Sequence, residues 1–137
     1  MTDAVRHPTR ISSPSQAWIG VFPARPDRVR HMRQGLARLL DGCPLADSAV
    51  LCLSELATNS VIHSDSRLPG GVISIRADIR YGEYIRIEVR DGGGPWKQQP
   101  HTDGRPHGLD IVSGLAADCG VRGDESSGWI AWARLDW

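Results

Sequence analysis

The hydrophobic and polar positions of this chain follow a helical period in three segments. In residues 29–40 apolar side chains recur at steps of three or four, and Asp41-Gly42 then ends the pattern. Residues 44–63 and 108–117 show comparable spacing. Because residues three or four apart share one face of a helix, each segment predicts an amphipathic helix with one side on a core.

Elsewhere the period is two. In residues 73–79 and 85–89, isoleucine, alanine and valine alternate with polar and charged side chains, and Tyr81-Gly82-Glu83 lies between the two runs. This pattern predicts a β-hairpin with one buried and one wet face. Residues 129–137 alternate in the same way and predict a final strand.

Two shorter apolar runs complete the set of elements. Residues 18–22 end at Pro23, which favours a strand at a sheet edge, and residues 119–121 predict another short strand. The resulting order is strand, two helices, two strands, helix and two strands. It predicts an α+β fold, a two-layer α/β sandwich whose mixed, mostly antiparallel sheet has helices on one face. We expect Arg and Glu side chains to cover the other face.

Length and composition narrow the class of protein. The chain has 137 residues with 40% apolar content, which suits one domain. Residues 1–16 are rich in Pro, Ser, Thr and Arg and predict a flexible N-terminal arm, so the single domain is expected over residues 17–137.

Charge and cysteine content bear on partners and location. Lys and Arg number 16, and Asp and Glu also number 16, so no net charge draws the protein to nucleic acid or to an anionic membrane. The three cysteines form no C-x-x-C pair, which favours free thiols in a reducing compartment. No apolar signal core or membrane-spanning run is visible, and we expect a cytoplasmic protein.

The segment Ser54–His63 carries the first candidate chemistry. Glu55, Asn59 and His63 are four residues apart and therefore form a polar stripe on the predicted helix. Such a stripe commonly faces only water. However, Asn59 is a poor helix former, and its place in mid-helix suggests a use in a site.

Asp91 is the second candidate. It has the sequence parity of Ile87 and Val89, so we expect its carboxylate to point toward the core, where burial is costly unless something binds it. A turn-initiating aspartate is the alternative. The glycines at 92–94 would let the backbone approach a ligand closely.

The third candidate is the segment Gly104–Leu109, where a loop is expected to become a helix. Free N–H groups and the dipole at a helix start attract phosphate. The only lysine, Lys97, does not follow a glycine, so the chain contains no P-loop. A nucleotide site would therefore use other chemistry.

Together these segments carry a known set of motifs. The pattern E-L-x-x-N-x-x-x-H at 55–63, D-x-G at 91–93 and G-x-x-x-G-L at 104–109 resembles the GHKL ATP-binding superfamily, which includes histidine kinases, DNA gyrase and heat-shock chaperones. Within it, the chain is similar to the bacterial anti-sigma-factor serine/threonine kinases. The resemblance covers about residues 17–135 and implies a Bergerat-type ATP-binding fold.

The resemblance also implies roles. Asn59 would coordinate a Mg²⁺ ion that bridges the ATP phosphates, Glu55 would be the general base, and Asp91 would accept a hydrogen bond from the adenine amino group. Gly93 would leave room for the adenine ring. The implied cofactor-binding positions are Asn59, His63, Asp91, Gly93, Gly94, Gly104, Arg105, His107, Gly108 and Leu109. The implied partners are a sigma factor, a STAS-type anti-anti-sigma protein that the kinase would phosphorylate, and a second copy in a homodimer.

Three departures from the motifs leave alternatives open. Pro95 stands where a further glycine often occurs, Pro106-His107 replaces a smaller dipeptide, and residues 128–132 lack the threonine that often helps to hold the site. An ATP-binding interaction module without useful catalysis, acting on a partner by occupancy, is therefore the second hypothesis. A hydrolase that uses Glu55 with His63 or His107 is the third.

Overall fold

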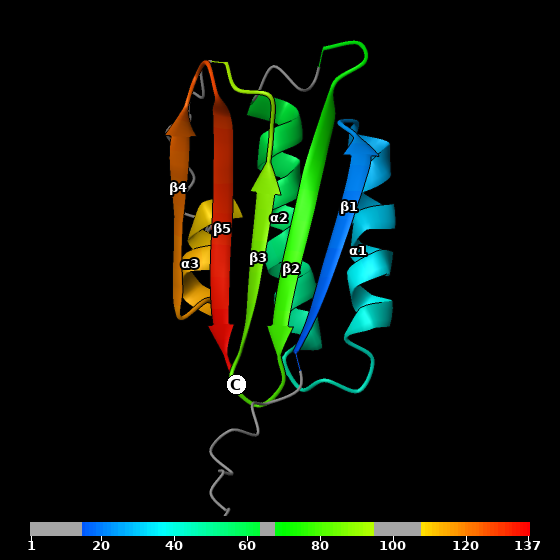
Figure 1. Cartoon of the computed structure of the whole chain (residues 1–137), viewed down its shortest axis with the longest axis vertical. Coiled ribbons are helices and arrows are strands. Elements are labelled where there is room, and N and C mark those ends of the chain that lie inside the picture. The colour runs from blue at the N-terminus through cyan, green and yellow to red at the C-terminus, as the bar shows by residue number, and fades with distance from the viewer. Residues whose placement is uncertain (1–14, 64–67, 95–107) are drawn as a thin grey trace, which may run out of the picture.

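The computed structural model describes residues 15–63, 68–94 and 108–137, and within them it has five strands and three α-helices (Figure 1). Their order is the one that the sequence pattern predicts. The bounds are β1 Ser15–Pro23, α1 Val29–Leu39, α2 Ala46–His63, β2 Val72–Arg80, β3 Tyr84–Arg90, α3 Gly108–Leu115, β4 Asp118–Asp124 and β5 Gly128–Asp136, with a 3-10 turn at Pro26–Arg28 before α1.

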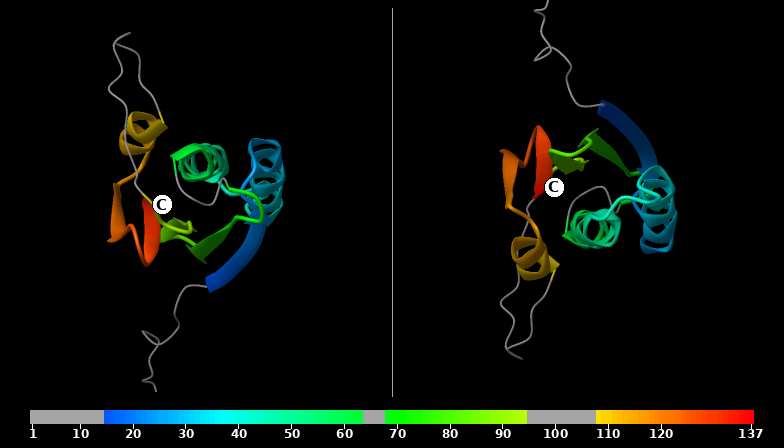
Figure 2. Two further views of the ribbon diagram at one scale, coloured as in Figure 1. Left: turned by 90° about the horizontal axis from the view of Figure 1, so that it is seen from above. Right: turned by 90° about the horizontal axis from the view of Figure 1, so that it is seen from below.

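The strands form one sheet in the order β1-β2-β3-β5-β4, and all four described pairings are antiparallel. Ile75 pairs with Val89, and Ile87 pairs with Ala133, so the inward side chains of neighbouring strands lie side by side. The three helices cover one face of this sheet, as Figure 2 shows. The predicted α+β two-layer sandwich is thereby confirmed.

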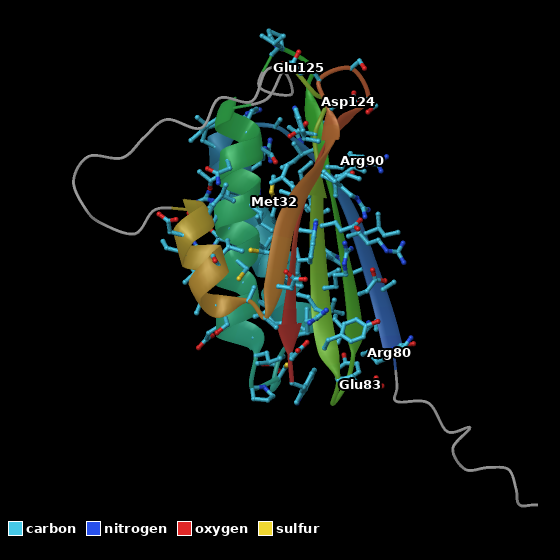
Figure 3. All side chains as sticks on the ribbon, turned by 90° about the vertical axis from the view of Figure 1, so that its left-hand side faces the viewer. Met32, Arg80, Glu83, Arg90, Asp124 and Glu125 are labelled. Atoms are coloured by element: carbon cyan, nitrogen blue, oxygen red, sulfur yellow. The ribbon has the colours of Figure 1, made fainter. Side chains whose placement is uncertain are left out.

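The core lies between these two layers. The inward side chains of β2 and β3 are buried, as are the apolar faces of α1 and α2, and Met32 of α1 lies between helices and sheet (Figure 3). Helix α2 is central: it packs against α1 on one side, α3 on the other, and strands β2, β3 and β5. A helix with neighbours on several sides needs apolar residues around most of its circumference. This explains why Ala49, Cys52, Leu53, Leu56, Ala57 and Val61 are all buried.

Three boundaries differ from the sequence prediction. Strand β1 already includes Ser15 and Gln16, which the composition of residues 1–16 places in the N-terminal arm; residues 1–14 lie outside the described residues. Strand β4 extends over Asp118–Asp124, because backbone pairing with β5 defines it and the glycines within it weaken its side-chain pattern. Helix α3 ends at Leu115, since the Ala117 N–H donates to the Arg134 carbonyl instead of continuing the helix.

The sheet face opposite the helices carries the expected Arg and Glu side chains on β2, β3 and β5, but on β1 it exposes the apolar side chains of Ile19 and Val21. Its strands carry ion pairs between residues two apart, which share one face. The pairs are Arg76–Asp78 at 2.8 Å, Arg86–Glu88, and Arg134–Asp136 at 2.9 Å, and Arg122 reaches Glu88 across strands at 3.1 Å. The pairs Arg76–Asp78 and Arg134–Asp136 are exposed and contribute little stability, whereas Arg86 and Glu88 are half-buried. Among the described residues, no helix has the length and apolar character to cross a membrane.

Candidate functional site

Asp91 lies directly after β3 and is 4% exposed, which confirms the inward direction that its parity predicts. Its Oδ1 accepts hydrogen bonds from two backbone N–H groups, that of Gly93 at 2.8 Å and that of Trp129 at 3.1 Å. The Asp91 N–H in turn donates to the Trp129 carbonyl at 3.0 Å. The carboxylate is thus held in one orientation by the backbone around it.

The two glycines after Asp91 have positive φ angles, 93° at Gly93 and 86° at Gly94. A Cβ on Gly93 would lie 2.3 Å from the Glu125 carbonyl oxygen, which itself accepts the Gly94 N–H at 2.8 Å. From sequence, Gly93 is expected where a ligand approaches the backbone closely. The structure supplies a reason within the protein: only a glycine fits beneath the turn between β4 and β5.

That turn is ordered by Asp124. Its Oδ1 accepts the Ser126 N–H at 2.9 Å, the Ser126 hydroxyl at 2.9 Å and the Ser127 N–H at 2.6 Å. The bonds from Ser127 and Ser126 lower the pKa of the Asp124 carboxyl to about 2. In Figure 3 Asp124 and Glu125 lie at the same end of the sheet as Arg90, the residue before Asp91. The turn therefore forms one wall around Asp91.

Trp129 is the residue that sequence reasoning missed. Besides the Trp129 N–H bond to Asp91, the indole Nε1 donates to the Gly94 carbonyl at 2.8 Å. In the sequence, the last strand stands out only for lacking a threonine. An available signal was that Trp129 shares the parity of Ala131 and Ala133, which face the helices.

Helix α2 supplies the polar stripe. Glu55 and Asn59 are both half-buried, one turn apart, on a helix that packs against β3 and α3. The C-terminal ends of α2 and β3 lie toward the same end of the molecule (Figure 1). Asn59 and Asp91 therefore come from neighbouring elements. His63 ends α2, but its side chain lies outside the described residues.

Cys52, one turn before Glu55, is fully buried. Burial raises the pKa of the Cys52 thiol to about 11, and the nearby Cys119 and Glu55 add to the effect. A thiol with so high a pKa is a poor nucleophile at neutral pH. Cys52 thus belongs to the core beneath the polar stripe rather than to its chemistry.

The third motif is only partly described. Gly108 begins α3 and Leu109 is half-buried against the core. Gly104, Arg105 and His107 lie outside the described residues, as do Pro95 and Pro106. The structure therefore brings together Asp91, Gly93 and Gly94 with Trp129, and it places Glu55 and Asn59 on the adjacent helix.

The donor set can be compared with what Mg²⁺ requires. Within the described part of the chain, no group of three or more His, Cys, Asp and Glu side chains could hold a metal ion. Mg²⁺ bound to a nucleotide takes phosphate and water oxygens and only one or two protein ligands. Asn59 is half-buried, and its amide oxygen could serve as one such protein ligand of Mg²⁺.

Comparisons with known proteins identify the family and the fold. The sequence model of the histidine kinase-like ATPase domain matches residues 22–132. No curated protein matches the chain. The crystal structure of the RsbU and RsbW domains of Rv1364c from Mycobacterium tuberculosis is similar, with a TM-score of 0.68 and 18% identity. That match covers 89% of this chain and 32% of the other, so this chain spans about a third of its neighbour's length. The structural likeness shows a shared fold, and the sequence match extends over most of the chain. The chain therefore belongs to the histidine kinase-like ATPase domain family.

Proposed function

We propose that this protein binds ATP with Mg²⁺ and regulates a sigma factor by phosphorylating a STAS-type antagonist on serine or threonine. The observation that carries the proposal is the Asp91 carboxylate, buried at the end of β3 and oriented by two backbone N–H groups. In a domain whose family is an ATPase family, a fixed and buried acceptor suits the amino group of adenine.

The roles on α2 follow from ligand chemistry. Asn59 would offer its amide oxygen to Mg²⁺, a hard cation that prefers oxygen. Glu55, one turn earlier, would accept the proton of the substrate hydroxyl, because phosphoryl transfer depends on positioning and charge neutralisation with a carboxylate at the nucleophile. The assignments of His63, Gly93, Gly94, Gly104, Arg105, His107, Gly108 and Leu109 to nucleotide contact remain predictions.

Partner proteins are part of the proposal. The structural neighbour contains RsbU and RsbW domains, and this likeness supports a place in a sigma-factor regulatory system. The proposed partners are a sigma factor, a STAS-type anti-anti-sigma protein and a second copy of the chain. The proposed location is the cytoplasm, where a sigma factor acts.

Calorimetry with MgATP tests the nucleotide site. We expect wild type to bind and Asp91→Asn to bind at least about tenfold more weakly, because the Asn amide group can present a donor to the donating amino group of adenine. Asp78→Asn is the matched control, since Asp78 pairs with Arg76 on the exposed sheet face. No heat of binding with wild type would contradict ATP binding.

Radiolabelled ATP tests the transfer step. With Mg²⁺ and a cognate STAS protein, wild type should produce phosphoserine or phosphothreonine, and Glu55→Gln should retain ATP binding while losing most of the transfer. Binding without transfer, given a confirmed cognate protein, would refute the kinase assignment. It would favour the interaction module that the departures at Pro95, Pro106 and residues 128–132 suggest.

A further inference from the structure

Besides accepting the Asp91 N–H with its carbonyl oxygen at 3.0 Å, Trp129 donates to the Asp91 segment at two points. Its backbone N–H donates to Asp91 Oδ1 at 3.1 Å, and its indole Nε1 donates to the Gly94 carbonyl at 2.8 Å. Between these points lies Gly93, whose N–H is the second donor to the same carboxylate oxygen. One residue at the start of β5 therefore holds both ends of the segment that orients Asp91.

The direction of the ring follows from the alternation along β5. Ala131, Ala133 and Leu135 face the helices and are buried, so Trp129 lies on that same side of the sheet. Trp132 has the opposite parity and lies under the Arg86 guanidinium, 5.0 Å from it, on the exposed face. Two tryptophans three residues apart on one strand thus face different sides, and only Trp129 lies on the side of the proposed site.

We propose that Trp129 is a positioning residue that sets the selectivity of the site for adenine over guanine. The inference rests on the proposed ATP site. In that site the adenine amino group would hydrogen-bond to the carboxylate of Asp91, whose orientation is set by the two backbone N–H groups that Oδ1 accepts. A carboxylate accepts the adenine amino group, but it opposes the guanine carbonyl oxygen, which is also an acceptor.

This discrimination depends on a carboxylate that cannot rotate. If Asp91 turned or the segment opened, water could bridge the carboxylate and the guanine oxygen, and the mismatch would cost less. The indole bond to the Gly94 carbonyl keeps the segment closed and so keeps the Gly93 N–H on Asp91. Removing that bond leaves the buried Gly94 carbonyl without its indole donor, and the segment can relax toward water.

The test compares two substitutions of the same ring. Trp129→Phe removes the ring N–H. Trp129→His keeps a ring donor, because imidazole Nε2 is as many bonds from the backbone as indole Nε1. MgATP and MgGTP dissociation constants are measured by calorimetry well below the melting temperature of each variant. Trp132→Phe on the same strand is the control, because its ring faces the opposite side.

We expect the ratio of the GTP to the ATP dissociation constant to fall about tenfold in Trp129→Phe, the size expected for one lost hydrogen bond to a buried group. Trp129→His should keep most of the ratio and Trp132→Phe all of it. The ratio compares two nucleotides on one preparation, so it does not depend on the folded fraction.

The outcomes separate the two proposals. A wild-type protein without ATP binding contradicts the proposed function. If wild type binds ATP but the ratio of the GTP to the ATP dissociation constant is unchanged in Trp129→Phe, the role of Trp129 is refuted and the proposed function is unaffected. If Trp129→Phe does not fold, Trp129→Leu takes its place, because leucine also lacks a ring donor: a ratio that falls about tenfold supports the role, and an unchanged ratio refutes it.

Discussion

The close contact of Gly93 with the β4–β5 turn gives a quantitative prediction. Gly93→Ala should destabilise the protein in the absence of any nucleotide, because the new Cβ would lie 2.3 Å from the Glu125 carbonyl oxygen. Gly82 in the β2–β3 turn is the matched control. Its φ of 82° resembles the 93° of Gly93, but a Cβ on Gly82 would meet nothing within 4 Å. The pair separates backbone strain from the steric contact.

The magnitude follows from these two terms. Placing an alanine at positive φ costs about 1–2 kcal/mol, and this is the whole expected loss for Gly82→Ala. At Gly93 the Glu125 carbonyl must also move, which adds an overpacking cost of about 1–3 kcal/mol and weakens the hydrogen bond from the Gly94 N–H, worth about 1 kcal/mol. Gly93→Ala should therefore lose about 3–6 kcal/mol, a large share of a typical domain's stability.

Urea unfolding followed by tryptophan fluorescence measures both variants, since the chain has five tryptophans. The slope of the free energy of unfolding against urea should be unchanged, while the midpoint falls further for Gly93→Ala than for Gly82→Ala. Equal losses in the two variants would refute the steric account. The positive φ would then be the only structural reason for a glycine at position 93, and the close approach of a ligand would explain it better.

Other positions give further predictions. The Asp124 pKa of about 2 lies below its ordinary 3.8, so the stabilisation from this carboxylate is complete above about pH 4 and is lost as the pH falls toward 2. Over that range the melting temperature should fall less in Asp124→Asn than in wild type. Parallel plots of melting temperature against pH for the two proteins would contradict this. Ellman's reagent on native protein at pH 8 should label half-buried Cys43 well before Cys52, and equal rates would argue against the buried, high-pKa thiol. Leu36→Ala should cost about 2–5 kcal/mol in urea unfolding, whereas exposed Leu51→Ala should cost under about 1; similar losses would contradict the assigned core.

Sequence periodicity predicted the element order well because burial imposes it. Each strand of the β2–β3 hairpin buries one face only, so alternate positions must be apolar, and the structure buries Ile75, Ile79, Ile85 and Ile87 as that pattern requires. The extent of β4 was less predictable. Gly120 and Gly123 leave little side-chain pattern, and backbone pairing with β5 decides where the strand begins and ends.

The local part of the site could also be predicted from sequence. The parity of Asp91 with Ile87 and Val89 predicted an inward carboxylate, which the structure confirms. The spacing of Glu55 and Asn59 predicted one helix face, and both lie half-buried on α2. These are properties of a single strand or helix, where geometry repeats every two or 3.6 residues.

Contacts between distant segments were decided only by the tertiary structure. The D-x-G motif resembles a ligand-binding motif, yet the space at Gly93 is set by a carbonyl 32 positions later in the chain. Trp129 is 38 positions from the carboxylate that it helps to orient. Its register against Asp91 depends on β3 and β5 pairing as neighbours, although α3 and β4 lie between them in sequence. Periodicity along the chain is therefore enough to predict which residues face inward, whereas the pairing of β3 with β5 sets which of them meet, because periodicity describes one element and contact requires two.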